Sequence, residues 1–280
     1  MGSNAHVPLE LLVEILNRLS QPDVLNSSHV SRLWRDTAQM KDEYYHSHRL
    51  SETLVREGNW LNAIDRWRQH AEESHGWPVL IDLNLRGPFG EDEMISAAAL
   101  RAASAIGNAL ARTRQLALSA RWPTVLECLV AGLGDLPAPN LRRLRIYLPH
   151  NWSTPWPHRL LSCGAPRLQE LVLFGVAPPQ TRLDACAQVL DLNLFDSSFD
   201  VRHVLCRNFP ALRTLCMDGC THVEQNDVAN RDRLDYAAPD LAELVEYNCA
   251  DIEAVCRSID FSLIRKLRVW DVTDITWRAT

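Results

Sequence analysis

The sequence predicts an α/β protein in which a short helical unit is followed by an irregular solenoid with a parallel sheet. Two observations predict it. Leucines recur at helical spacing near the N-terminus, and an apolar-x-x-apolar-x-apolar pattern recurs from residue 80 to residue 269. A composition of 46% hydrophobic and 23% charged residues is typical of a globular chain with a buried core. We therefore expect a helical unit over residues 1–40, a helical connector over 41–78 and a repeat domain over 79–280.

Composition and charge exclude several function classes. The net charge of -6 argues against binding to nucleic acid, because a phosphate backbone needs a basic face. No apolar run approaches the roughly 18 residues of a membrane span, and the N-terminus lacks a signal peptide's pattern. We therefore expect a protein of the cytoplasm, the nucleus or both, without a nucleic-acid or membrane partner. The eight cysteines are then expected to be reduced thiols.

Residues 7–40 predict three short helices. The first places four leucines on one face, with Ile15 beside them: Leu9, Leu12, Leu16 and Leu19. Pro8 suits the first helical position. Ser20 and Asp23 have the spacing of a capping box, so a second helix is expected to begin there. Its apolar contacts are expected from Val24, Leu25, Val30, Leu33 and Trp34.

The ordered residues of this unit resemble an F-box. They are Val7-Pro8-Leu9-Glu10-Leu11-Leu12, Ile15-Leu16, Leu19, Asp23-Val24-Leu25, Val30-Ser31-Arg32 and Trp34-Arg35. Ser27 and His29 depart from the resemblance, because these places are usually apolar in the family. The resemblance covers about one eighth of the chain. It implies docking to a Skp-family adaptor and, through it, to a cullin. The implied contacts are Pro8, Leu9, Leu11, Leu12, Ile15, Leu16, Leu19, Val24, Leu25, Val30 and Trp34.

The first helix is also expected to be apolar on more than one side. Leu11 and Val13 lie off the main stripe of leucines. About forty residues cannot bury a self-sufficient core, so such a helix needs a partner for its second face. That partner is either an adaptor or the domain that follows in the chain.

The segment over residues 41–78 predicts a helix that caps the repeat domain. Four large side chains follow helical spacing before a break at Gly76-Trp77-Pro78: Trp60, Leu61, Ile64 and Trp67. His46 and His48 lack further ligands at metal spacing, so we expect surface residues and no metal site.

The recurring pattern is typical of leucine-rich repeats. Its clear members are Leu80-Leu83-Leu85, Leu141-Leu144-Ile146, Leu168-Leu171-Leu173, Val189-Leu192-Leu194, Leu212-Leu215-Met217 and Ile264-Leu267-Val269; weaker members are Thr113-Leu116-Leu118 and Leu241-Leu244-Glu246. The intervals are 33, 28, 27, 21, 23, 29 and 23 residues, and most fit the roughly 20–29 residues of such repeats. Prolines stand two residues before four of the first positions: Pro139, Pro166, Pro210 and Pro239. Cys220 and Cys249 occupy the place where these repeats carry Asn or Cys.

Strand alternation predicts which residues face outward on the concave side of the sheet. One row is expected to be Arg86, Ser119, Tyr147, Phe174, Phe195, Asp218, Tyr247 and Trp270; a second is expected to be Asp82, Gln115, Arg143, Glu170, Asp191, Thr214, Glu243 and Lys266. The five aromatic residues of the first row are either a target-binding hot spot or a stack along the ladder. The alternating charges of the second row predict cross-strand pairs. Arg143 and Arg145, with Arg142, are candidates for an acidic or phosphorylated target segment or are solvated.

Three functions remain open at this level. The first is a non-enzymatic substrate receptor of a Skp–cullin–F-box ubiquitin ligase, which the resemblance favours. The second is an enzyme with a cysteine nucleophile, for which five cysteines are available outside any known motif: Cys128, Cys163, Cys186, Cys206 and Cys256. The third is a leucine-rich repeat scaffold without a ubiquitin role. No phosphate loop, dinucleotide fingerprint or metalloprotease motif occurs, so we expect no cofactor.

Overall fold

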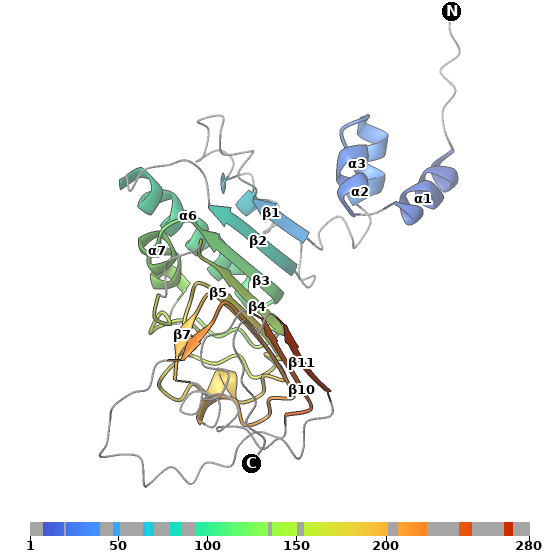
Figure 1. Cartoon of the computed structure of the whole chain (residues 1–280). Helices are drawn as coiled ribbons and strands as arrows, with labels where there is room; N and C mark the ends of the chain where they lie inside the picture. The colour runs from blue at the N-terminus through green and yellow to red at the C-terminus, as the bar shows by residue number, and fades with distance from the viewer. Residues whose placement is uncertain are drawn as a thin grey trace, which may run out of the picture.

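A computed structural model describes residues 8–19, 21–39, 47–50, 64–65, 67–69, 79–85, 93–133, 136–149, 154–200, 207–222, 241–247 and 266–270. It confirms a mixed α/β protein with an N-terminal helical unit and a parallel sheet (Figure 1).

The N-terminal unit consists of three helices: α1 (Leu9–Arg18), α2 (Gln21–Ser27) and α3 (Arg32–Gln39). Pro8 lies one residue outside α1, as its N-cap. Helix α3 packs against both α1 and α2. The small core holds the fully buried Leu12, Leu16, Val24 and Ala38. Ser20, the predicted cap of the second helix, lies outside the described residues.

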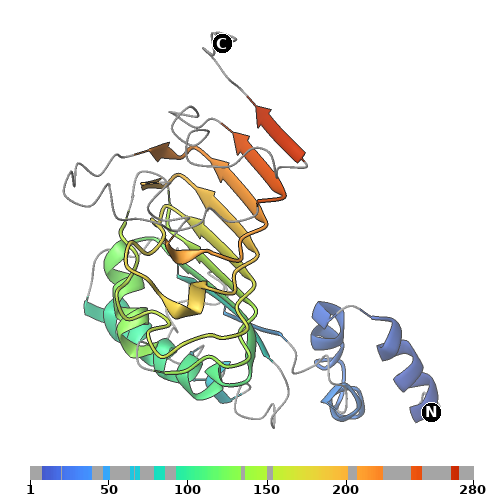
Figure 2. The ribbon, with the colours of Figure 1, turned by 90° about the horizontal axis from the view of Figure 1, so that it is seen from below.

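Within the described residues, nine parallel strands form the main sheet in the order in which they occur along the chain: β1 (Ser47–Leu50), β2 (Val79–Leu85), β3 (Thr113–Ala120), β4 (Arg143–Tyr147), β5 (Glu170–Phe174), β6 (Asp191–Phe195), β8 (Thr214–Asp218), β10 (Glu243–Tyr247) and β11 (Lys266–Trp270). Figure 2 shows them side by side. Two further short strands, β7 (Ser198–Phe199) and β9 (Thr221–His222), pair separately. Each strand of the main sheet after β2 coincides with a predicted repeat.

Strand β1 lies inside the segment that was predicted to be a helical connector. It pairs parallel with β2, so the sheet begins before residue 79. The four residues of β1 are too few for an alternation of apolar and polar side chains to predict a strand. Residues 64–65 and 67–69 of this segment are helical, and Ile64 and Trp67 join the main core. Trp60 and Leu61 lie outside the described residues.

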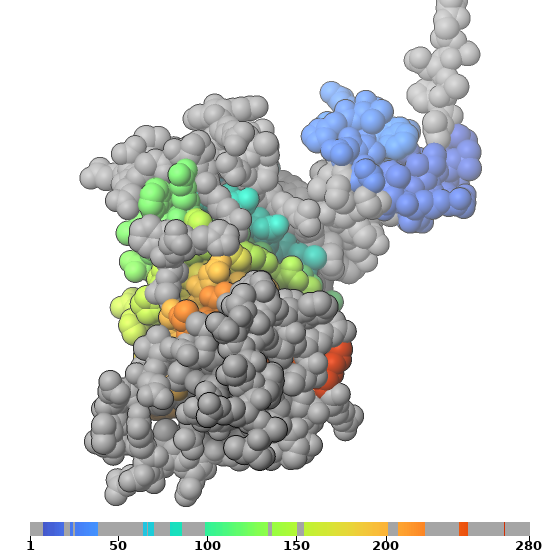
Figure 3. All heavy atoms as spheres, viewed as in Figure 1, coloured from blue at the N-terminus to red at the C-terminus, as the bar shows by residue number. Residues whose placement is uncertain are grey.

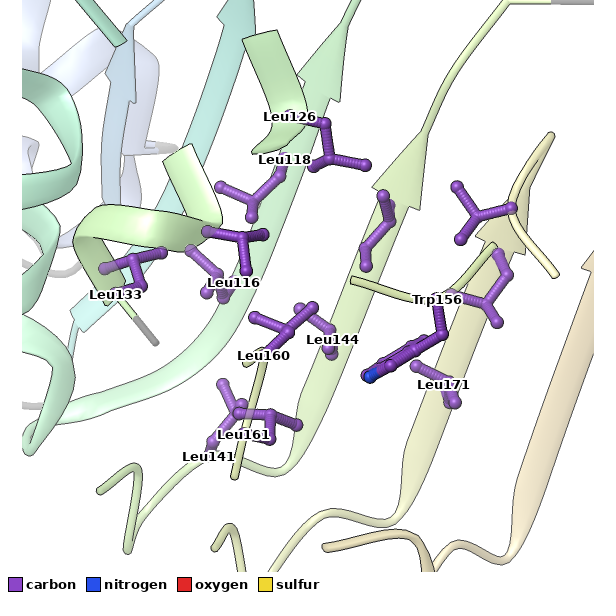
Figure 4. Close-up of a cluster of buried hydrophobic side chains, with 14 of the residues drawn as sticks. Leu116, Leu118, Leu126, Leu133, Leu141, Leu144, Trp156, Leu160, Leu161 and Leu171 are labelled. Carbon is purple, nitrogen blue, oxygen red and sulfur yellow. The ribbon is translucent and has the colours of Figure 1, made fainter. Parts of the chain in front are cut away.

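The inward face of the sheet carries the core. The inward positions of β3–β6 and β8 are at most 1% exposed: Leu116, Leu118, Leu144, Ile146, Leu171, Leu173, Leu192, Leu194, Leu215 and Met217. Two helices, α6 (Glu93–Leu110) and α7 (Pro123–Leu133), lie on this side of β2–β4, as Figures 1 and 2 show. The described turns between β4 and β5 supply the facing side chains Trp156, Leu160 and Leu161 (Figure 4). A one-turn 3-10 helix, η2 (Asp184–Cys186), precedes β6.

Tight turns lead into the strands and explain the recurring prolines. The amide of Leu141 donates to the Ala138 carbonyl at 3.1 Å, and equivalent bonds join Leu168 to Ala165 and Leu212 to Phe209. Pro139, Pro166 and Pro210 are the second residue of these four-residue turns, a position that a fixed φ near −65° suits. Proline therefore shapes the turn, and the strand starts four residues later. Pro239 lies outside the described residues.

The predicted register of β2 is wrong by two residues. Ile81 and Leu83 pair with Leu116 and Leu118, and the register shifts between Val79 and Leu80. Val79 is therefore the buried partner of Thr113, whereas Leu80 is half-buried. The seven-residue strand alternates without interruption, so its apolar spacing alone fits two frames equally well.

Removing a core leucine tests the shared interior. Leu171→Ala is expected to lower the free energy of unfolding by about 2–5 kcal/mol, because Leu171 is fully buried and its loss leaves a cavity. Leu100→Ala is the matched control, because Leu100 is 49% exposed on α6. Urea denaturation of both variants measures the difference. Equal losses would show that the inward leucines do not form the core described here.

Candidate functional site

Exposed apolar side chains gather on the N-terminal helices. Of the eight large apolar side chains that are exposed among the described residues, six belong to this unit: Leu9, Leu11, Val13, Ile15, Val30 and Leu33. Figure 3 shows the three helices in blue as one lobe. The core of this lobe shares no residue with the core of the sheet. The helices thus hold apolar surface that neither their own small core nor the sheet's core covers.

The geometry of α1 explains this surface. Leu12 and Leu16 form the buried seam of the helix. At 100° per residue, Leu11 and Ile15 lie on one side of this seam, and Leu9 and Val13 lie on the other. Leu11 is 52% exposed and Ile15 is 41% exposed. The helix is therefore apolar over more than half of its circumference, as the spacing predicted.

The opposite side of α1 is polar. Glu14 and Arg18 form an exposed ion pair of 2.6 Å across one helical turn. Glu10 lies in the first turn, where a negative charge complements the helix dipole. The polar side faces solvent at little cost, which leaves the two apolar stripes as the surface available for docking.

The structure divides the eleven predicted adaptor contacts. Pro8, Leu9, Leu11, Ile15 and Val30 are exposed. The other described members lie inside or at the edge of the unit: Leu12, Leu16 and Val24 are buried, and Leu19 and Trp34 pack against them. These five hold the helices together instead of offering surface, because a helix of this size buries one seam only. The Leu25 side chain lies outside the described residues.

Two polar residues stand where the F-box resemblance leads one to expect apolar ones. Ser27 is 9% exposed, and its hydroxyl donates to the Val24 carbonyl at 2.8 Å. His29 is exposed in the turn after α2. Val30 and Leu33 were expected to pack inside the unit, but they are 67% and 41% exposed because α2 already ends at Ser27. The unit therefore tolerates both departures without an unsatisfied buried group at Ser27.

Comparison with known families identifies the N-terminal unit. Residues 5–46 match the family model of the F-box domain. The match includes all three helices and extends past the predicted bound at residue 40. F-box domains as a class bind adaptors of the Skp family.

No curated protein matches the chain. Among the described residues, no helix has both the length and the apolar character to cross a membrane. The sheet therefore has to be understood from its own geometry.

The second candidate surface is the face of the sheet opposite α6 and α7, here called the ladder face. Register places one row across it: Asn84, Ser119, Tyr147, Phe174, Phe195, Asp218, Tyr247 and Trp270. Asn84 takes the place predicted for Arg86, which lies outside the described residues. The rest of the row is as predicted, although the side chains of Tyr247 and Trp270 lie outside the described residues.

Three neighbouring aromatic rings form a continuous stack on the ladder face. The centroids of Tyr147 and Phe174 are 6.3 Å apart, and those of Phe174 and Phe195 are 5.9 Å apart with planes at 22°. All three side chains remain half-buried. The rings thus stack along the ladder and still present area to a partner. Asp218 ends the stack at β8.

An open groove of about 450 Å³ lies over these rings and is lined by Arg145, Tyr147, Glu170, Val172, Phe174, Asn193 and Phe195. Val172, Asn193 and Glu170 were not predicted as target contacts. The period of the strand could have indicated them, because residues two or four positions before the aromatic row share its face of the sheet. Val172 is only 7% exposed and forms part of the apolar floor.

Charges along the second outward row pair across strands, as predicted. Arg143 bonds Glu170, and Lys266 bonds Glu243. Arg145 Nη2 reaches the second carboxylate oxygen of Glu170 at 3.3 Å. Asp82 does not belong to this row, because it pairs with Ala117. Arg143 and Arg145 thus share the carboxylate of Glu170. In the described structure, Arg145 Nε is buried without a hydrogen-bond partner.

The cysteines do not form a candidate active site within the described part of the chain. Five are free thiols: Cys128, Cys163, Cys186, Cys216 and Cys220. Burial raises the pKa of Cys186 to about 12, so it carries no thiolate at neutral pH. Cys220 is a buried donor to backbone carbonyls at 3.5 and 3.6 Å, as predicted for its place in the turn. The described residues hold no cluster of metal-ligating side chains, and Cys206, Cys249 and Cys256 lie outside them.

Thiol alkylation tests the contrast between Cys186 and Cys163. Iodoacetamide at neutral pH is expected to modify the exposed Cys163 and to leave the buried Cys186 unmodified in the native protein. Because the folded-state pKa is raised, this protection is expected to persist as pH rises past 9 and to fail only near 12 or on unfolding. Peptide mass spectrometry reads both sites. Rapid native modification of Cys186 would contradict its burial.

Proposed function

We propose that this chain is the substrate-recognition subunit of a Skp–cullin–F-box ubiquitin ligase. The F-box docks a Skp-family adaptor, and the adaptor bridges to a cullin. The sheet then holds a target protein on its ladder face. The chain brings the target close to the ubiquitin-transfer machinery. Because both are then held in one assembly, the transfer of ubiquitin becomes effectively intramolecular.

The exposed apolar stripes of α1 carry the first half of this proposal. Four side chains of one helix, between 38% and 52% exposed, are costly to leave in water unless a partner covers them. Full burial of a side chain of this kind contributes roughly 1.5–3 kcal/mol. Half-exposed side chains give about half of that each, so the four together contribute about 3–6 kcal/mol to docking.

The second half rests on treating the sheet as an irregular leucine-rich repeat solenoid over residues 79–280. Strands β3–β6, β8, β10 and β11 recur at the predicted intervals and pair in chain order. Residues after three strands adopt left-handed backbone conformations, with φ of 67° at Gly175, 49° at Asp196 and 62° at Gly219. One turn is thus reused from repeat to repeat, as a solenoid requires.

The aromatic stack makes the ladder face the proposed target surface. Tyr147, Phe174 and Phe195 supply rigid area, and Arg143 and Arg145 supply polar contacts at its border. Tyr247 and Trp270 extend the same row in register. A receptor of this kind needs no catalytic residue, so we propose a non-enzymatic role in the cytoplasm, the nucleus or both.

Adaptor binding is expected to fail when one apolar stripe of α1 is removed. In Leu11→Ala/Ile15→Ala, affinity for a Skp-family adaptor is expected to fall about thirtyfold or more, because hot-spot truncations cost about 2 kcal/mol or more. Isothermal titration with the purified adaptor measures the change. The helix is expected to remain folded, because Leu12 and Leu16 keep its core.

The matched control changes the polar side of the same helix. Glu14→Ala/Arg18→Ala removes an exposed ion pair and is expected to leave adaptor affinity within about twofold. Normal adaptor binding by the apolar variant, or an equal loss in the control, would refute docking through this stripe.

Target capture is expected to depend on the aromatic stack. In Phe174→Ala/Phe195→Ala, proteins captured by the wild-type chain are expected to be lost while the adaptor is retained, because the groove loses its floor. Quantitative affinity purification compares this variant with Gln115→Ala/Thr214→Ala, which lies on the same face outside the groove. An unchanged set of captured proteins would show that targets bind elsewhere.

A further inference from the structure

The edge of the sheet at which the strands begin carries an unbalanced positive charge. Four exposed arginines lie there, here called the basic edge: Arg114, Arg142, Arg167 and Arg213. The described turn segments of this edge are 111–114, 138–142, 165–169, 187–190, 210–213 and 241–242, and they contain no Asp or Glu. This edge therefore contrasts with a chain whose net charge is -6.

Backbone hydrogen bonds fix the basic edge in register. The amide of Arg142 donates to the Arg114 carbonyl at 2.8 Å, and the Gln169 amide donates to Arg142 at 2.9 Å. Leu190 and Arg213 continue the row, each by a bond of 2.8 Å. Adjacent strands are about 4.8 Å apart, so Arg114 and Arg142 are direct neighbours of like charge. Such an arrangement is unfavourable without an acidic partner.

The described residues do not provide an acidic partner for these arginines. Arg114, Arg142 and Arg213 take part in none of the ion pairs of the described residues. Arg167 donates to the neutral Asn140 Oδ1 at 3.0 Å, so its charge also stays uncompensated. The row of strand residues that follows carries Glu170 and Asp191, and Glu170 is already bound by Arg143 and Arg145.

A groove of about 350 Å³ opens on this edge between three successive turns, lined by Arg142, Pro166, Arg167, Gln169, Gln188 and Leu190. Its walls offer two guanidinium groups and two amides, which donate to carboxylates. Pro166 and Leu190 add apolar surface that suits the methylene groups of glutamate. Single-stranded nucleic acid fits less well, because its binding needs aromatic stacking and the described edge segments contain no aromatic residue.

We propose that the basic edge binds an acidic polypeptide segment of a partner protein, with clustered glutamate or aspartate side chains seated in this groove. The proposal is separate from the F-box and the ladder face. It holds or fails whether or not the chain docks an adaptor.

Fluorescence anisotropy of a fluorescein-labelled oligoglutamate peptide, titrated with the full-length protein, tests this proposal. Wild type is expected to bind saturably at low salt, and affinity is expected to fall as salt rises. Arg142→Glu/Arg167→Glu is expected to weaken binding at least about tenfold, because two attractions become repulsions. An oligoglutamine peptide is expected not to bind.

The matched control is Arg121→Glu/Arg159→Glu, which makes the same change in net charge at exposed arginines outside the basic edge. Its affinity is expected to stay within about twofold of wild type. Thermal melting of each variant verifies that it is folded. Absent binding by wild type, or an equal loss in the control, would overturn the proposal. Equally tight binding of a single-stranded oligonucleotide that is lost in Arg142→Glu/Arg167→Glu would reassign the edge to nucleic acid and overturn it as well.

Discussion

The N-terminal helices carry more apolar surface than about thirty residues can enclose, and the rest of the account depends on this imbalance. Leu12 and Leu16 satisfy the one seam that α1 can bury against α3. Leu9, Leu11, Val13 and Ile15 remain outside it. A larger domain would fold over such side chains, but a unit of this size has a high ratio of surface to volume. The F-box therefore leaves its second apolar face exposed.

The sheet solves the same problem by repetition. A single strand with two or three inward leucines cannot bury them alone, but the strands before and after it cover them. The inward residues of β3–β6 and β8 are fully buried for this reason. Helices cover the first part of the sheet and turns with large side chains cover the next, so the intervals between repeats vary without disturbing the strands (Figure 4). The outward side chains form the ladder face, where the aromatic stack and the ion pairs of Glu170 set the chemistry.

Much of this arrangement could be predicted from the sequence, because strand and helix periods are local. The inward leucines of β4–β6 and the outward row from Ser119 to Asp218 follow from alternation alone. The register of β2 against β3 could not be predicted, because an uninterrupted alternation of apolar residues fits two registers equally well. Strand β1 was missed, because four residues carry no period. The division of α1 into buried Leu12 and exposed Ile15 needed the packing of α3, which no local pattern contains.

Docking through the F-box predicts a specific thermodynamic signature. The most direct test is calorimetric titration of the full-length chain with a purified Skp-family adaptor at several temperatures. The account predicts a stoichiometric complex with a clearly negative heat-capacity change, because the exposed stripes of α1 leave water on binding. A complex with no heat-capacity change, or no complex at all, would contradict it.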